Sequence, residues 1–127
     1  MENNKPKVSI VVPAYNVEEY IGKCLTSLTN QSLKDIEILV VNDGATDKTL
    51  QIAEEFAKKD SRIKIISQQN AGLSEARNTG LKAVNGEFTG FLDSDDWVDE
   101  NFYEKLYFSA KNNKCDIAVA SVVRKKE

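Results

Sequence analysis

A cluster of carboxylates has the clearest chemical meaning in this sequence. Five acidic residues fall between positions 93 and 100 with no Lys or Arg among them: Asp93, Asp95, Asp96, Asp99 and Glu100. The last three precede or open an expected helix, where a carboxylate gains about 0.3–1 kcal/mol from the helix dipole, and this explanation suffices for Asp99 and Glu100. Asp93 and Asp95 instead follow an apolar run, and alternate residues of an extended segment point to the same side.

Two carboxylates placed in this way suit a divalent cation. Mg²⁺ and Mn²⁺ prefer oxygen ligands, and such ions keep open positions for phosphate oxygens. Asp93 and Asp95 therefore predict an ion that bridges and neutralises a diphosphate. The alternative interpretation of the pair is a solvated turn.

Three further positions have side chains or backbone groups that could contact a ligand. Asp43 lies between Asn42 and Gly44, and it either belongs to an ordinary Asp-Gly turn or accepts a hydrogen bond from a base or ribose. The triplet at 70–72, Asn-Ala-Gly, precedes an expected helix and offers backbone N–H groups to an anion. Arg77 lies one helical turn later, and it either reaches a phosphate or is an exposed helical arginine.

Missing residues and spacings exclude several other kinds of site. The chain has no histidine, which excludes Ser/His/Asp and Cys/His nucleophilic catalysis and zinc sites with imidazole ligands. No Gly-x-Gly pair occurs, and Gly22-Lys23 lacks the upstream glycine of a P-loop, so dinucleotide and Walker-type sites are excluded. Trp97 stands where a calcium-binding EF-hand requires Asp or Asn. Cys24 and Cys115 are interpreted as small buried side chains of a protein in a reducing cytosol.

Length and charge indicate one globular domain. The chain has 127 residues, of which 41% are hydrophobic and 29% are charged. Its 17 Lys and Arg against 20 Asp and Glu give a net charge of −3, which argues against a nucleic-acid partner. Neither an export signal nor the roughly 20 apolar residues of a membrane span are present. We therefore expect a cytoplasmic location, with membrane association of the full-length protein as an open alternative.

Apolar periodicity predicts strands and helices in strict alternation. Short β-branched or apolar runs indicate strands at 8–12, 36–41, 63–66, 88–92 and 117–123. Apolar residues at three- and four-residue spacing indicate helices over 20–28, 50–57 after an N-cap at Asp47, 73–84 and 102–110. This order predicts an α/β fold in which helices cover both faces of a mostly parallel sheet. Ligands bind at the carboxyl ends of such strands, which selects the loops 13–16, 42–46, 67–72 and 93–97.

Each of these four loops lies within a longer motif. The motifs are VSIVVPAYN at 8–16, VVNDGATD at 40–47, NAGLSEARNTG at 70–80 and FLDSDD at 91–96. Together and in this order they resemble the family 2 glycosyltransferases of GT-A fold, although Ala45 stands where serine is usual. The resemblance extends from residue 8 to about residue 106, and the ordered set is far more specific than one Asp-x-Asp motif.

The resemblance implies a site for a nucleotide-diphosphate sugar, typically a UDP-sugar, with a divalent metal. It assigns the site residues to four groups: Pro13, Ala14, Tyr15 and Asp43 at the base, Asp93 and Ser94 at the ribose and diphosphate, Asp95 at the Mg²⁺ or Mn²⁺ ion, and Gly72 and Arg77 near the donor. Asp93 and Asp95 thus remain the expected metal-binding pair.

The resemblance also implies the reaction. The family inverts the anomeric carbon by direct displacement, with an Asp or Glu base that deprotonates the acceptor hydroxyl. That base comes later in the family's chain, so we expect residues 1–127 to be a single donor-binding domain that ends before the acceptor-binding part. The expected acceptor is a saccharide or a lipid-linked molecule in polysaccharide or glycoconjugate synthesis.

Two alternatives to a glycosyltransferase stay open. One is a non-catalytic module that binds a sugar nucleotide, because no carboxylate in the chain matches the family's base motif. The other is a nucleotidyltransferase, which has less support because residues 13–16 contain neither the Gly nor the Lys or Arg of a triphosphate loop.

Overall fold

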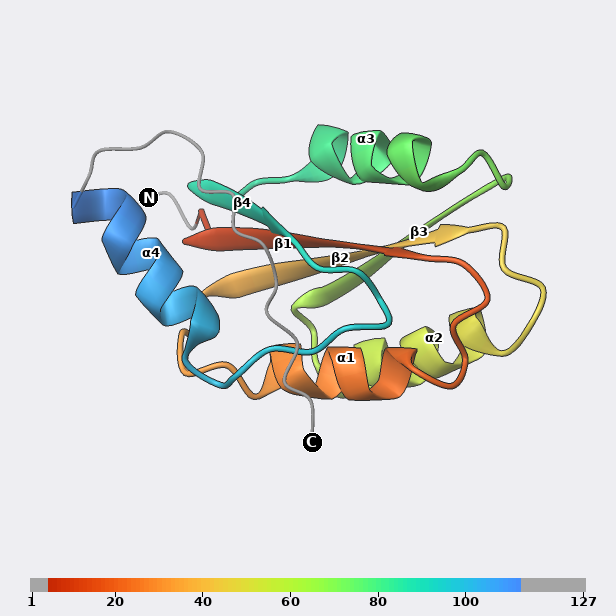
Figure 1. Cartoon of the computed structure of the whole chain (residues 1–127), viewed down its shortest axis with the longest axis horizontal. Helices are drawn as coiled ribbons and strands as arrows, with labels where there is room; N and C mark the ends of the chain where they lie inside the picture. The colour runs from red at the N-terminus through yellow and green to blue at the C-terminus, as the bar shows by residue number, and fades with distance from the viewer. Residues whose placement is uncertain (1–4, 113–127) are drawn as a thin grey trace.

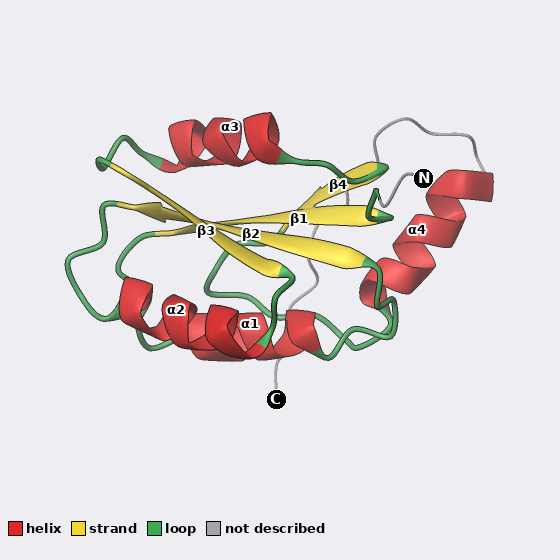
Figure 2. Ribbon diagram, turned by 180° about the vertical axis from the view of Figure 1, so that it is seen from behind, coloured by secondary structure: helices red, strands yellow, loops and turns green. Residues whose placement is uncertain are grey.

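Four parallel strands form a central sheet in the order β3-β2-β1-β4. The structure, a computed structural model, describes residues 5–112. Its strands are β1 (Val8–Ala14), β2 (Ile36–Asp43), β3 (Ile63–Gln68) and β4 (Phe88–Phe91). Helix α3 (Leu73–Ala83) covers one face of the sheet, and α1 (Ile21–Thr29) and α2 (Thr49–Lys59) cover the other (Figure 1, Figure 2). The prediction of an α/β fold with helices on both faces is confirmed.

The two central strands, β1 and β2, are buried along their whole length. Their almost continuous Val, Ile and Leu content suits strands that are covered on both faces. They pair in parallel register from Val8 opposite Ile36 to Ala14 opposite Asn42. Both strands therefore run two residues further than predicted, and they end directly at the loops that the motifs single out.

Helix α1 packs on the sheet through an apolar stripe. Ile21, Cys24, Leu25 and Leu28 are fully buried, and their three- and four-residue spacing places them on one side of the helix. Tyr20, which was predicted on the same stripe, precedes the helix and is 52% exposed. Burial of Cys24 agrees with its interpretation as a small core side chain.

The start of helix α2 differs from the prediction by one residue. Lys48 occupies the N-cap position, so the prediction of Asp47 for that position is wrong. Asp47 still satisfies the helix start, because its Oδ1 accepts the N–H of Thr49 at 2.9 Å. Its Oδ2 accepts the N–H of Glu18 at 3.2 Å, which ties α2 to the loop before α1.

Helix α3 lies close to β1 because it turns small residues toward the sheet. Its buried residues are Ala76 and Gly80, and a Cβ at Gly80 would lie 2.4 Å from Cγ1 of Val11. A larger side chain at this position would therefore force the helix away from the strand. Leu73 and Leu81, which were predicted on the buried side of this helix, are instead 51% and 43% exposed.

Helix α4 (Phe102–Asn112) lies beside the amino-terminal ends of β1 and β4 (Figure 1). Tyr103, Tyr107 and Ala110 are its buried residues, and the Tyr107 ring meets Phe88 edge to face with 5.6 Å between centroids. The predicted fifth strand at 117–123 and the second cysteine, Cys115, lie outside the described residues.

Candidate functional site

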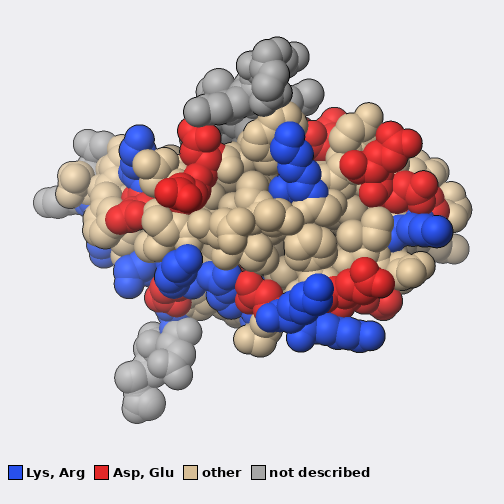
Figure 3. Space-filling view, turned by 90° about the horizontal axis from the view of Figure 1, so that it is seen from below, with Lys and Arg blue, Asp and Glu red and all other residues tan. Residues whose placement is uncertain are grey.

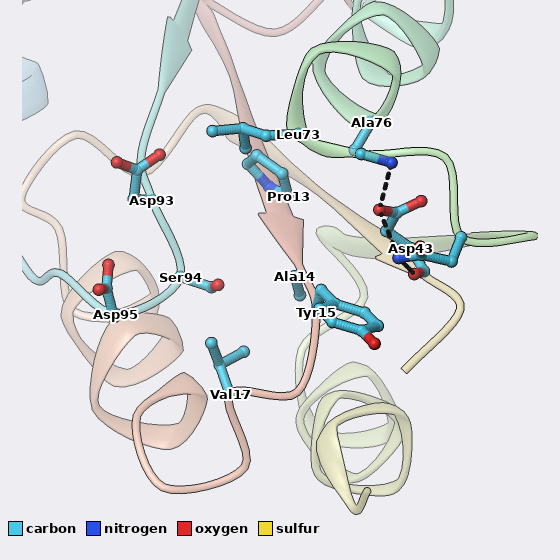
Figure 4. Close-up of a pocket in the computed structure, with 12 residues that line it drawn as sticks. Pro13, Ala14, Tyr15, Val17, Asp43, Leu73, Ala76, Asp93, Ser94 and Asp95 are labelled. Atoms are coloured by element: carbon cyan, nitrogen blue, oxygen red, sulfur yellow. Dashed lines mark hydrogen bonds between the residues drawn. The ribbon is translucent and has the colours of Figure 1, made fainter. Parts of the chain in front are cut away.

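A pocket of about 490 Å³ opens at the carboxyl ends of the strands (Figure 4). This is the edge at which ligands bind in open parallel sheets. The residues that line it are Pro13, Ala14, Tyr15, Val17, Asp43, Asn70, Gly72, Leu73, Ala76, Asp93, Ser94 and Asp95. Eight of the nine residues predicted for the site are in this set, and the ninth, Arg77, reaches it through an ion pair described below.

The pocket has two chemically different ends. Figure 4 shows Asp93, Ser94 and Asp95 on one side and Tyr15 and Asp43 on the other. The end of β1 lies between them, so the strand order β2-β1-β4 sets the separation of the two ends. This arrangement suits an elongated ligand with one flat part and one part that could share a divalent cation with the carboxylates.

The loop after β1 places an aromatic side chain at the pocket. The ring of Tyr15 is 48% exposed, so one part of it is available to a ligand. Asn16 has a φ of +49°, a left-handed conformation that Asn tolerates better than most residues, and it turns the chain after Tyr15. Asn16 Oδ1 accepts the N–H of Thr46 at 2.8 Å, which joins this loop to the loop after β2.

Asp43 at the end of β2 is buried and fully hydrogen-bonded. It is 3% exposed, and its Oδ1 accepts Gln68 Nε2 and Ala71 N, both at 2.9 Å. Its Oδ2 accepts Gly72 N at 3.0 Å and Asn70 Nδ2 at 3.2 Å. Desolvation alone would raise the pKa of Asp43, but the hydrogen bonds from Gln68, Ala71 and Gly72 hold that pKa below its ordinary value. The carboxylate is therefore ionised near neutral pH.

The backbone N–H groups predicted to bind an anion already do so. The anion is the carboxylate of Asp43, which Ala71 and Gly72 contact just before α3 begins. Gly44 makes this approach possible, because it has a φ of +72° and a Cβ there would lie 2.6 Å from Asn70 N. Asp43 thus fixes the start of α3 against the end of β2.

The acidic segment after β4 gathers three carboxylates. One oxygen from each of Asp93, Asp95 and Asp96 lies within 4.8 Å of the other two. The N–H of Asp96 donates to the carbonyl of Asp93 at 3.0 Å, and this turn brings Asp96 back toward Asp93. A set of hard oxygen donors at this spacing fits Mg²⁺ or Mn²⁺, with room for further oxygen ligands.

Arg77 reaches this acidic segment from helix α3. Its Nη2 donates to Asp93 Oδ1 at 3.1 Å, and both side chains are roughly half exposed, at 40% and 48%. Among the described residues, its Nε is buried without a hydrogen-bond partner. Arg77 therefore has one buried N–H that the described residues leave without an acceptor.

Cys24 lies beneath the acidic segment but is not a nucleophile. Its thiol is buried and forms a weak contact with the carbonyl of Asp93, with 3.9 Å between sulfur and oxygen. Burial raises the pKa of this thiol, and the neighbouring carboxylates of Asp96, Asp95 and Asp93 raise it further. The thiol thus stays protonated.

The sequence prediction missed residues whose role arises only in the folded chain. The predicted metal pair omits Asp96, although its position directly after Asp95 was a usable signal. Gln68 contacts Asp43 because β2 and β3 pair in a register that sets the two residues opposite each other, and no local signal shows this. The prediction also missed the apolar part of the lining: Val17, Leu73 and Ala76.

The surface opposite α3 has mixed charge. Figure 3 shows Lys and Arg beside Asp and Glu over the face that α1 and α2 cover.

Within residues 5–112, no helix has both the length and the apolar character that crossing a membrane requires.

Comparison with known sequences points to one family. The family model described as Glycosyl transferase family 2 matches residues 9–127. A protein of Bacillus subtilis (strain 168) named "Uncharacterized glycosyltransferase EpsJ" is 52% identical over 112 residues, which cover 88% of this chain and 33% of that protein.

Two solved structures share the fold. TarS from S. aureus, in complex with UDP-GlcNAc, has a TM-score of 0.80 and 36% identity over 85% of this chain and 32% of its own. The mannosyltransferase PcManGT from Pyrobaculum calidifontis, in complex with GDP-Man and Mn²⁺, has a TM-score of 0.69 and 25% identity over 74% of this chain and 29% of its own. The chain thus spans about a third of the length of the Bacillus subtilis protein and of these two solved chains, and a fifth of a longer solved chain of TarS.

Proposed function

The chain belongs to glycosyltransferase family 2, and we propose that it binds the UDP-sugar donor of an inverting, metal-dependent glycosyltransferase. The observation that carries this proposal is the pocket with Tyr15 and Asp43 at one end and Asp93 and Asp95 at the other, where a carboxylate oxygen of Asp96 lies within 4.8 Å of theirs. The donors bound by TarS and PcManGT, UDP-GlcNAc and GDP-Man, support a nucleoside-diphosphate sugar as the ligand class.

The nucleobase belongs at the end formed by Tyr15 and Asp43. The Tyr15 ring offers a face for stacking, and Pro13 and Ala14 add apolar surface. Ionised Asp43 accepts an N–H of the base in place of Asn70 Nδ2, which is its longest contact at 3.2 Å. Uridine has a ring N–H where cytidine has an acceptor nitrogen, so an ionised carboxylate favours uridine over cytidine.

The diphosphate belongs at the acidic end. Asp93, Asp95 and Asp96 would hold Mg²⁺ or Mn²⁺, and the ion, when bound, neutralises the diphosphate and makes it a better leaving group. Arg77 keeps Asp93 in place, and its half-exposed guanidinium is positioned to contact a phosphate oxygen. The hydroxyl of Ser94 lies in the pocket and donates to the ribose or diphosphate, and Gly72 permits close approach at the start of α3.

Sugar transfer also requires an acceptor site and a general base, which the pocket does not contain. The relatives are at least about three times as long, which supports placing the acceptor site and the general base outside these 127 residues. We propose a saccharide or lipid-linked acceptor in polysaccharide or glycoconjugate synthesis, with transfer in the cytoplasm and membrane association, if any, through the longer protein.

Calorimetry with UDP tests the proposal. We expect UDP to bind with MnCl₂ present and to lose at least about tenfold in affinity when EDTA removes the metal, whereas uridine should be indifferent to the metal. Asp95→Asn should remove the metal-dependent part of UDP affinity. Asp35→Asn removes the same charge from a half-exposed side chain at the opposite end of the sheet, and it should change nothing. Equal UDP affinity with and without metal would contradict metal use, and absence of UDP binding would contradict the donor assignment.

A further inference from the structure

The buried carboxamide of Gln31 connects helix α1 to the segment that follows the three carboxylates. Gln31 lies just after α1 and is 0% exposed. Its Nε2 donates to the carbonyls of Ser27 at 3.1 Å and Asp99 at 2.6 Å, and its Oε1 accepts the N–H of Tyr103 at 3.0 Å. Both of its amide hydrogens and its oxygen are therefore used.

Neighbouring contacts hold the same segment to α1. The N–H of Ser32 donates to the carbonyl of Glu100 at 2.6 Å, and the N–H of Val98 donates to Ser27 Oγ at 3.3 Å. The segment from residue 98 to the first turn of α4 thus rests on the end of α1 through hydrogen bonds at several points.

The acidic segment itself depends on how its two ends are fixed. Residues 93–97 belong to no helix or strand. Their upstream end is fixed by β4, where the N–H of Leu92 donates to the carbonyl of Val11 at 3.0 Å. Their downstream end is fixed by α1, and two of those hydrogen bonds involve Gln31, which contacts the carbonyl of Asp99 and the N–H of Tyr103.

We infer that Gln31 is a positioning residue for the metal end of the donor site, an inference that rests on the proposed function. The residue is too deeply buried to touch a donor, and it acts by holding the chain that carries Asp93, Asp95 and Asp96 at one spacing. Loss of groups that orient metal ligands typically weakens metal binding by 10- to 100-fold. The base end, formed by Tyr15 and Asp43, rests on other strands and should not respond.

The test is Gln31→Met, which keeps most of the volume and removes all three hydrogen bonds. In the chain of 127 residues, we expect the Kd of UDP in saturating MnCl₂ to rise about tenfold or more, with the Kd of uridine unchanged. Binding is measured by calorimetry at a temperature where circular dichroism shows the variant folded. The matched control is Ile63→Ala, which removes a buried side chain from β3 at the far edge of the sheet. It should lower the melting temperature without changing either Kd.

The outcomes separate the inference from the proposed function. If wild-type chain shows no metal-dependent UDP binding, the proposed function fails. If the wild type binds and Gln31→Met binds UDP with MnCl₂ equally well, the positioning role is overturned. The same holds if Gln31→Met loses as much affinity for uridine as for UDP. Should Gln31→Met not fold, Gln31→Glu decides, because it keeps an oxygen for the N–H of Tyr103 and removes the N–H that the carbonyl of Asp99 accepts. A rise in the Kd of UDP with MnCl₂, at constant uridine affinity, supports the inference, and no rise overturns it.

Discussion

Nη2 of Arg77 lies 3.1 Å from Oδ1 of Asp93, so a cation on helix α3 holds the first carboxylate of the acidic segment. Since both side chains are about half exposed, the pair contributes little to the stability of the fold. Its importance is geometric, because it links the helix above the sheet to the loop after β4.

Replacing Arg77 by Gln should therefore weaken ligand binding more than it weakens the fold. We expect the Kd of UDP with MnCl₂ to rise about fivefold, which corresponds to roughly 1 kcal/mol, and the Kd of uridine to stay constant. Calorimetry measures both. Lys82→Gln removes an exposed cation from the last turn of the same helix and is the control. An equal loss for uridine would show that Arg77 supports the base end.

Replacing Asp43 by Asn should weaken UDP and uridine alike. The variant cannot accept four N–H donors, and its amide presents hydrogens where a base N–H must be accepted. We expect a loss of about tenfold for both ligands, with little change for CDP, because cytidine lacks the ring N–H. If uridine affinity survives while only UDP weakens, Asp43 belongs to the phosphate end and the assignment is wrong.

A second buried carboxylate predicts how stability depends on pH. Glu37 lies in β2 with a side chain 3% exposed, and it accepts hydrogen bonds from Ser9 Oγ at 2.5 Å, Asn85 N at 2.6 Å and Lys64 Nζ at 3.2 Å. Desolvation would raise its pKa, but the bonds from Ser9, Asn85 and Lys64 lower it below the ordinary value of 4.5.

Because the folded-state pKa of Glu37 is lowered, its contribution to stability is complete above the unfolded-state pKa and is lost as pH falls through the folded-state pKa. Glu37→Gln should thus cost about 2 kcal/mol at pH 7 and make the loss of stability below about pH 4 shallower. Urea unfolding from pH 7 to pH 2 measures this. Parallel curves for the variant and wild type would contradict the prediction.

Two helical glycines should respond to alanine in opposite directions. At Gly80 the new Cβ would lie 2.4 Å from Val11, so Gly80→Ala should cost about 1–3 kcal/mol through overpacking. At Gly22 in α1, the new Cβ would meet no atom within 4 Å apart from its chain neighbours and its own helix backbone, so Gly22→Ala should stabilise the fold by about 0.5–1 kcal/mol. Thermal unfolding of both variants checks the pair. A stabilising Gly80→Ala would mean that α3 can shift at no cost.

The sequence predicts the strands and helices well where burial alone determines the residue type. Strands β1 and β2 are covered on both faces, so each is visible as a run of β-branched residues. Pro13 was predicted to end the first strand, but β1 continues to Ala14. This is possible because β4 pairs with β1 only as far as Val11. The backbone N–H that proline lacks would face the side of β4 beyond the end of that strand, so its absence breaks no pairing.

The site was predictable in its types of residue and less so in its contacts. Asp93, Asp95 and Asp43 follow strands, and parallel topology brings such positions to one edge. The contacts of Gln31 with Asp99 and Tyr103 join residues 68 and 72 positions apart, and they depend on how α1 packs beside the segment before α4. Apolar periodicity predicts which side of a helix is buried. It does not predict which distant carbonyl accepts a hydrogen bond from a buried side-chain amide.

Strand β4 has four residues and, among the described strands, pairs with β1 alone. The carboxylates are therefore attached to a short edge strand, where local opening needs less free energy than global unfolding. Opening of β4 would disperse the three carboxylates proposed to bind a metal, while β1, β2 and β3 stay paired. The affinity for the donor then includes the free energy of keeping β4 paired with β1. Slower amide hydrogen exchange in residues 88–91 would therefore be a sensitive sign of donor binding. Any segment that pairs with the edge of β4 that the described strands leave unpaired would strengthen donor binding without touching the donor.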